Sequence, residues 1–166
     1  RTGTFNAFTQ FRLDADIIIM AKGIGGGLPL GAIAGNKRVE NVFTYGEHGS
    51  TFGGNPVAAS SGIVVMEELE QGLMQKNKVK GDLLKSKLKI IAVKYPGKIK
   101  AIRGMGLMLG VELTSPGQTV VDELIKLNVL VNCTNENVIR LLPPFIINET
   151  DIELFISKFD EVISRL

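Results

Sequence analysis

The sequence predicts an α/β fold, because short apolar runs of strand length alternate with longer segments of helical pattern. Hydrophobic residues make up 45% of the 166 residues and charged residues 22%, which is enough apolar surface to bury a core. The length predicts one domain, or one and a half. The chain begins at Arg1 without Met and without a helix or strand signal, so we expect a segment of a larger protein.

The first strand is predicted over residues 15–21, an Ile-rich run whose length and glycine-rich stop favour a buried strand over a helix. Residues 23–31 form a loop, with five Gly and one Pro in nine positions. Further along we expect a strand over residues 32–35, a short helix over residues 37–43 capped by Asn36, and a second glycine-rich loop over residues 45–54.

Two helices are predicted in the middle of the chain. Asn55 is a fitting N-cap and Pro56 a fitting first residue for a helix to about residue 70, whose small apolar first half we expect to be buried. Gly72 ends this helix. A second helix over residues 73–95 is amphipathic, with its apolar side marked by Leu83, Leu84, Leu88 and Ile91.

The pattern changes after Pro96-Gly97, and we place the boundary between two structural units within residues 72–97. Strands are predicted over residues 99–103 and 107–113, joined through residues 104–106, and again over residues 129–132 and 138–142. Helices are predicted over residues 120–127 and, capped by Thr150, up to residue 166. The inward side of the last helix is Ile152, Leu154, Phe155, Phe159, Val162 and Ile163.

Composition excludes several classes of function. The net charge of +2 gives no case for a nucleic-acid or membrane partner. Cys133 is the only cysteine, which excludes an intrachain disulfide and fits a cytoplasmic protein. One Cys and one His (His48) cannot supply the usual zinc ligands, so we expect no metal site. No apolar run is long enough to span a membrane, and the first residues lack a signal-peptide pattern.

Lys22 stands where an apolar strand ends and a glycine loop begins. Ligand sites of open α/β sheets lie at the carboxyl ends of strands. Apolar neighbours would desolvate the amine and favour its neutral, nucleophilic form. The alternative, which position alone favours, is an exposed lysine that merely ends a strand. The glycine run completes neither the dinucleotide GxGxxG pattern nor a P-loop.

Two further places carry candidate binding residues. Ser50 and Thr51 precede a helix N-terminus, where hydroxyls and free backbone N–H groups suit a phosphate or carboxylate; a plain loop with an ordinary cap is an equal alternative. Arg140 lies in a strand pattern between apolar residues and could bind a substrate carboxylate in a two-pronged way. Its alternative, outward alternation on a half-exposed strand, is slightly favoured by periodicity.

Other polar residues favour structural roles. Asp14 and Asp16 precede the first strand and fit a turn and a strand edge better than an acid/base pair. His48 could take part in proton transfer, but hydrogen bonding within its loop is the favoured interpretation.

Together these segments resemble the class III (ornithine-type) aminotransferases, which use pyridoxal 5'-phosphate (PLP) and have fold type I. The resemblance is carried by RTG at residues 1–3, DIIIMAKG at 16–23, GGGLPLGA at 25–32 and HGSTFGGNP at 48–56. Within the class, VNCT at residues 131–134 and NVIRLLPP at 137–144 are similar to the acetylornithine branch.

The resemblance implies a fold and a role for each candidate residue. Residues 1–72 would be the end of the PLP-binding large domain, residues 73–97 a linking helix, and residues 98–166 the small C-terminal α/β domain. By this likeness Lys22 holds the cofactor covalently and moves the substrate proton. The remaining matched positions are Thr51 for the cofactor phosphate across a dimer interface, Ser50 near the acylated substrate, and Arg140 for the substrate α-carboxylate.

The resemblance also implies an activity, the transfer of an amino group between N-acetylornithine and 2-oxoglutarate in arginine biosynthesis, by a cytoplasmic homodimer. Ornithine, succinylornithine and 4-aminobutyrate enzymes share much of the pattern and stay as alternatives. The family's aspartate for the pyridine nitrogen should precede residue 1, so we expect this chain alone to be inactive. A module that dimerises without chemistry is a further alternative.

Overall fold

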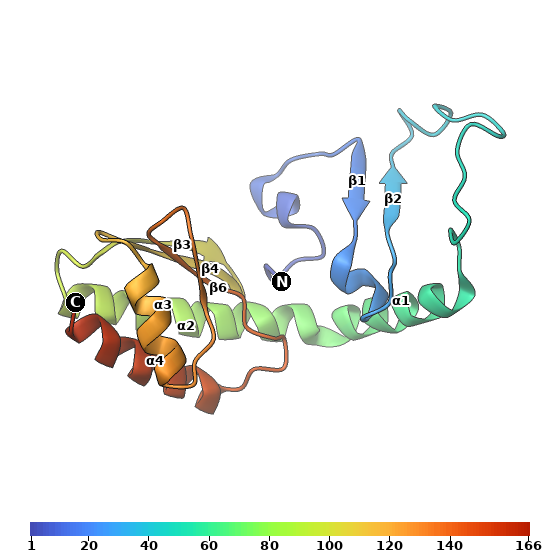
Figure 1. Cartoon of the computed structure of the whole chain (residues 1–166). Coiled ribbons are helices and arrows are strands. Elements are labelled where there is room, and N and C mark those ends of the chain that lie inside the picture. Colours follow the sequence, from blue (N-terminus) through green and yellow to red (C-terminus); the bar gives the residue numbers. More distant parts are fainter. The chain divides into compact units, whose positions relative to one another are not determined.

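The first four residues, Arg1–Thr4, fold together with the C-terminal part of the chain. The computed structural model describes all 166 residues and divides them into two units (Figure 1). The N-terminal unit is Phe5–Leu73, and the C-terminal unit joins Arg1–Thr4 to Met74–Leu166. Both units mix helices with a sheet, as an α/β prediction requires.

The N-terminal unit is built on a ribbon of two antiparallel strands, β1 (Ile17–Met20) and β2 (Ala32–Gly35). Both strands were predicted, but the expected burial of the first is wrong. The side chains of Ile17 and Ile19 are 54% and 77% exposed, because a two-stranded ribbon in this unit leaves them uncovered. Short 3₁₀ helices precede and follow β1, as η1 (Ala7–Phe11) and η2 (Lys22–Gly25).

The helix predicted over residues 37–43 is wrong. The Oδ1 atom of Asn36 accepts a hydrogen bond from the backbone N–H of Arg38 at 2.8 Å, and separate turns follow at Val39 and Val42. A seven-residue helix with no packing partner gains too few hydrogen bonds to offset its nucleation cost.

Helix α1 (Pro56–Glu68) begins as predicted, because the side chain of Asn55 accepts hydrogen bonds from the N–H groups of Val57 and Ala58. The expected burial of its first half is mostly wrong, since Ala58 and Gly62 are its buried residues while Val57 and Val64 are exposed. A π-type turn, η3 (Leu69–Leu73), follows.

Gly72 breaks the helical path between α1 and α2 as predicted, with a φ of 105° that a side-chain-bearing residue rarely adopts. Helix α2 (Met74–Lys94) then runs along the sheet of the C-terminal unit. Leu84, Leu88 and Ile91 are buried, which confirms the predicted apolar side of this helix.

The C-terminal unit contains a four-stranded antiparallel sheet in the order β3-β4-β6-β5. Its strands are β3 (Ile99–Met105), β4 (Met108–Leu113), β5 (Asn132–Thr134) and β6 (Val138–Leu141). The β3–β4 turn lies at Gly106-Leu107, later than predicted, because β3 continues to pair with β4 as far as Met105.

The strand predicted over residues 129–132 is displaced, since β5 begins only at Asn132. Helix α3 (Gln118–Lys126) ends with Asn128 in the left-handed region at φ 60°, and the N–H of Val129 still bonds to the carbonyl of Leu124. The C-terminal cap of the helix therefore uses residues that the apolar pattern had assigned to a strand.

Helix α4 (Glu149–Ser164) is capped by Asn148, and the prediction of Thr150 as the cap is wrong. Asn148 and Asp151 form a reciprocal capping box in which each side chain accepts the other's backbone N–H. Most of the predicted inward side is confirmed, but Leu154 is 54% exposed. The buried residues of this helix are Ile152, Phe159, Val162 and Ile163.

The core of the C-terminal unit lies between one face of the sheet and helices α2, α3 and α4, which Figure 1 shows grouped around the strands. Leu109, Val111 and Leu113 of β4 point into this core. Alternation along the strand puts Met108, Gly110 and Glu112 on the other face, called the open face below. No helix of the structure is both long enough and apolar enough to cross a membrane.

Candidate active site

Lys22 is the first residue of η2, two residues past the end of β1. Its φ is 58°, a left-handed conformation that is uncommon for a residue with a side chain. Its side chain is exposed in this chain, so the expected desolvation of the amine is wrong for these residues. Arg12, Asn128, Asn135 and Glu136 share this conformation, so it does not by itself assign a function to Lys22.

The glycine loop after Lys22 is fixed against helix α1. The hydroxyl of Ser61 donates a hydrogen bond to the carbonyl oxygen of Gly25 at 2.9 Å. A β-carbon on Gly26 would lie 2.6 Å from the Ser61 Oγ, so this position has no room for a side chain. The helix that Asn55 caps thereby holds the loop that begins at Lys22.

Ser50 and Thr51 lie in an exposed turn just ahead of α1. The turn is closed by a hydrogen bond from the N–H of Gly53 to the carbonyl oxygen of Ser50 at 3.1 Å. Ser50 and Ala21, the residue before Lys22, both border one open hollow of about 1000 Å³. The structure therefore brings Ser50 and the end of β1 to a common hollow within the N-terminal unit.

The other polar residues of this unit have structural partners. Arg38 pairs with both predicted turn residues, at 3.4 Å from Asp14 and 2.7 Å from Asp16, which ties the segment before β1 to the segment after β2 at one end of the ribbon. His48 stacks on Phe43 with 5.9 Å between the ring centroids. The ion pairs agree with the structural interpretation of Asp14 and Asp16, whereas His48 makes a ring-stacking contact in place of the expected loop hydrogen bond.

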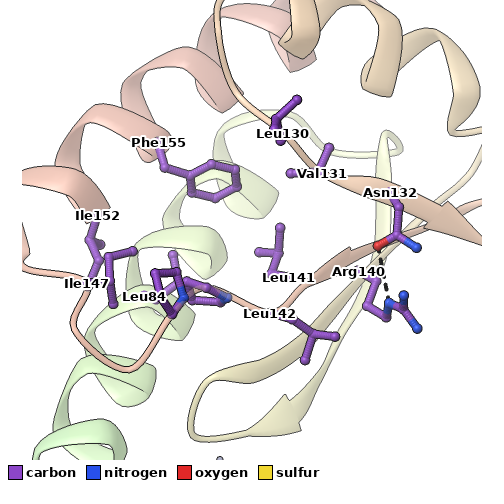
Figure 2. Close-up of a pocket in the computed structure, with 12 residues that line it drawn as sticks. Leu84, Leu130, Val131, Asn132, Arg140, Leu141, Leu142, Ile147, Ile152 and Phe155 are labelled. Carbon is purple, nitrogen blue, oxygen red and sulfur yellow. Dashed lines mark hydrogen bonds between the residues drawn. The ribbon is translucent and has the colours of Figure 1, made fainter. Parts of the chain in front are cut away.

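Arg140 belongs to the C-terminal unit, where it lies on β6 between the buried residues Ile139 and Leu141. Alternation puts its side chain on the open face, as the periodicity favoured. The Nε of Arg140 donates a hydrogen bond to the Oδ1 of Asn132 at 3.2 Å (Figure 2). Arg140 forms no ion pair, although arginine is the side chain best suited to grip a carboxylate with two parallel hydrogen bonds.

A second charged cluster lies on the same face. The carboxylate of Glu112 forms ion pairs with Lys100 at 2.8 Å and with Arg103 at 2.6 Å. The hydrogen bond from Lys100 and the two positive charges hold the pKa of the Glu112 carboxyl below its usual value, against the opposing effect of desolvation. Sequence reasoning missed this cluster, which only the cross-strand register brings together.

An apolar hollow of about 400 Å³ lies beside Arg140 at the end of β6. In Figure 2 the guanidinium of Arg140 points away from Phe155 and Leu84, which line the opposite end of this hollow. Asn132, which sequence reasoning also missed, borders the hollow next to Arg140. Nowhere do three His, Cys, Asp or Glu side chains gather as they would to hold a metal ion.

Comparison with known proteins places these residues in a family. The family model described as aminotransferase class-III matches residues 1–163. The chain therefore belongs to the class-III aminotransferases, which confirms the resemblance read from its glycine-rich motifs.

The relatives narrow the likeness further. Over all of this chain, 39% of residues are identical to the acetylornithine aminotransferase of Methanocaldococcus jannaschii, and over 98% of it 44% are identical to that of Aquifex aeolicus. The chain spans 42% of the length of each relative.

A solved structure is similar to this chain, with a TM-score of 0.89 and 28% sequence identity. The similarity covers 99% of this chain and 40% of the chain in that structure. It is an ornithine aminotransferase from Toxoplasma gondii, crystallised with oxidised glutathione, that reveals partial occupancy of PLP at its active site.

Proposed function

We propose that this chain is the C-terminal part of a PLP-dependent aminotransferase that moves an amino group between N-acetylornithine and 2-oxoglutarate, a step of arginine biosynthesis. The observation that carries the proposal is the place of Lys22, which follows β1 and opens the glycine loop held by α1, in a chain of the class-III aminotransferase family. Residues 1–72 would then be the last part of the PLP-binding large domain. Residues 73–97 would be the helix that links the domains, and residues 98–166 would form the small domain.

Ser50 borders the hollow of the N-terminal unit, and Thr51 and Lys22 are each next in sequence to a residue that borders it. These three residues fit the chemistry of PLP. A phosphate group suits the hydroxyls and backbone N–H groups of the turn at Ser50 and Thr51, just ahead of the α1 N-terminus. An aldehyde suits a primary amine, which Lys22 supplies. The volume of about 1000 Å³ leaves room for a small-molecule cofactor beside this turn.

Lys22 would hold the cofactor and carry the substrate proton. PLP, when bound, supplies the electron sink of the reaction. The amine of Lys22 accepts the proton from the reacting carbon of the donor and returns a proton to the acceptor. The contact of Ser61 with the loop at Gly25 and Gly26 holds the backbone from which this side chain extends.

The other predicted residues would bind what Lys22 acts on. The turn at Thr51 would hold the phosphate across the interface of a homodimer, and Ser50 would lie near the acyl group of the substrate. Arg140, an arginine without an ion pair, would take the substrate α-carboxylate. Since the chain spans 42% of its relatives, we expect turnover in a full-length, cytoplasmic protein and not in these residues alone.

The direct test replaces Lys22 with Ala in the full-length protein. We expect loss of the visible absorption band of bound cofactor, and loss of the mass increase that borohydride reduction gives the wild type. Lys37→Ala, which removes an exposed lysine of the same unit, is the matched control and should keep both signals. A Lys22→Ala protein with undiminished turnover would contradict the proposal.

The choice of amino donor is tested separately. We expect kcat/KM to be highest for N-acetylornithine when ornithine, N-succinylornithine and 4-aminobutyrate are compared with 2-oxoglutarate as acceptor. A higher value for another donor would keep the aminotransferase chemistry and overturn the acetylornithine assignment.

A further inference from the structure

We propose that Asn132 is a positioning residue that orients Arg140 to receive a carboxylate end-on, without neutralising its charge. This inference rests on the proposed role of Arg140 in substrate binding. Asn132 belongs to the VNCT segment at residues 131–134. The resemblance to the aminotransferase family gave this residue no role.

The register of the sheet places the two side chains together. Asn132 is the direct cross-strand partner of Arg140 in the β5–β6 ladder, so both side chains point to the open face. Directly paired side chains of neighbouring strands lie about 5 Å apart at their β-carbons, within reach of a hydrogen bond. The hydrogen bond from Arg140 Nε to Asn132 Oδ1, drawn in Figure 2, is the only one that the Arg140 side chain makes in this chain.

The bonding position decides which part of the guanidinium is left over. Because Nε donates to Asn132, the two terminal nitrogens, Nη1 and Nη2, stay available for a ligand. Two parallel hydrogen bonds from these atoms match the two oxygens of a carboxylate. The ligand class is therefore a carboxylate that approaches end-on, as the α-carboxylate of an amino acid or of a 2-oxo acid can.

The charge of the open face favours the same ligand. Glu112, the acidic side chain of this face, is shared by Lys100 and Arg103. Arg140 is held by a neutral amide, so its positive charge is not cancelled by a protein carboxylate. An aspartate at position 132 could form the same hydrogen bond but would compete with the ligand for the cation.

The opposite neighbour of Arg140 leaves space for the ligand. Gly110 of β4 pairs directly with Arg140, and the next residue across the sheet is Arg103 of β3. A β-carbon on Gly110 would lie 3.1 Å from Val138 Cγ1, so a side chain there would crowd this face. Across the sheet, Arg140 therefore has the amide of Asn132 on one side and Gly110, which has no side chain, on the other.

The experiment uses the full-length protein and measures the affinity for 2-oxoglutarate by calorimetry, together with KM and kcat. We expect Asn132→Ala to weaken binding roughly tenfold, as loss of one hydrogen bond to a charged group does, with kcat little changed. We expect Asn132→Asp to weaken binding further at neutral pH, and to recover affinity as the pH falls and the new carboxyl is protonated.

The control is Asn135→Asp, which makes the same chemical change in the exposed β5–β6 turn. It should bind 2-oxoglutarate within about twofold of wild type, as expected for a distant surface change. The proposal is overturned if both Asn132 variants match this control. Arg140→Gln separates the two levels of inference: if it also leaves the affinity unchanged, the assignment of Arg140 itself fails, and if it alone weakens binding, only the role of Asn132 fails.

Discussion

The guanidinium of Arg1 lies over the aromatic ring of Phe145, with 4.4 Å between its Cζ and the ring centroid. The same guanidinium donates to the carbonyl oxygens of Leu107 and Pro143. Arg1 therefore connects the β3–β4 turn to the segment that follows Arg140 on β6. Lys80 of α2 bonds to the carbonyl oxygen of Phe145 at 3.0 Å and holds this segment from a second side.

Replacing Arg1 with Met should destabilise the C-terminal unit by about 2 kcal/mol, since it removes charge-assisted hydrogen bonds and a cation–π contact. Arg1→Lys should fall between wild type and Arg1→Met, because it keeps the charge and loses the fork. Urea unfolding of the full-length protein, with hydrogen exchange of β4 and β6 amides, measures the effect. Equal stability of all three proteins would show that the contact contributes nothing.

Replacing Lys22 with Gly should yield a protein more stable than Lys22→Ala by about 1 kcal/mol, because the left-handed φ of 58° strains any residue with a β-carbon. Both variants lose the amine, so catalysis does not separate them. Thermal unfolding measures the difference. At Lys37, whose backbone is not left-handed, the order of stability of the Gly and Ala variants should be reversed. There Ala should be the more stable replacement, and the same order at both positions would argue against strain at Lys22.

Replacing Gly81 with Ala should destabilise the protein by about 3 kcal/mol, the upper range for overpacking. A helix interior normally gains about 1 kcal/mol from this change. Here the new β-carbon would lie 2.3 Å from the carbonyl carbon and oxygen of Gly106, where α2 meets the β3–β4 turn. Lys89→Ala on the exposed side of α2 is the control and should change stability little. A stabilised Gly81→Ala protein would mean that the helix and the turn separate easily.

Local signals in the sequence were enough to predict most of the helices and strands. Asn55-Pro56 fixes the start of α1 through a side-chain cap, and Gly72 separates α1 from α2 through its left-handed φ; both depend on neighbouring residues alone. Burial was harder to predict. The apolar run around Ile19 indicates a side chain fit for a core, but a covering surface is made by residues remote in sequence, and in this unit none covers it.

Some residues of the candidate site could be predicted from local sequence, and others only from the fold. Lys22, Ser50 and Arg140 stand in sequence patterns that could be recognised one at a time. The contact between Asn132 and Arg140 depends on the register of two strands, and a prediction that began β5 three residues early could not find it. The β5–β6 turn sets that register, through Asn135 and Glu136, whose left-handed φ values no apolar pattern indicates.

Replacing Glu112 with Gln should remove an acid-sensitive part of the stability. The folded-state pKa of Glu112 is lowered by the hydrogen bond from Lys100 and by the neighbouring charges. Its contribution is therefore fully present above the pKa of a glutamate in the unfolded chain, about 4.3, and is lost as the pH falls through the folded-state value. At neutral pH the variant leaves Lys100 and Arg103 without their shared carboxylate, so wild type should be the more stable protein. The gap between the two urea midpoints should close below the unfolded-state pKa, whereas Glu136→Gln in the exposed turn should track wild type throughout. A gap that stays constant into acid would mean that Glu112 acts by packing and not by its charge.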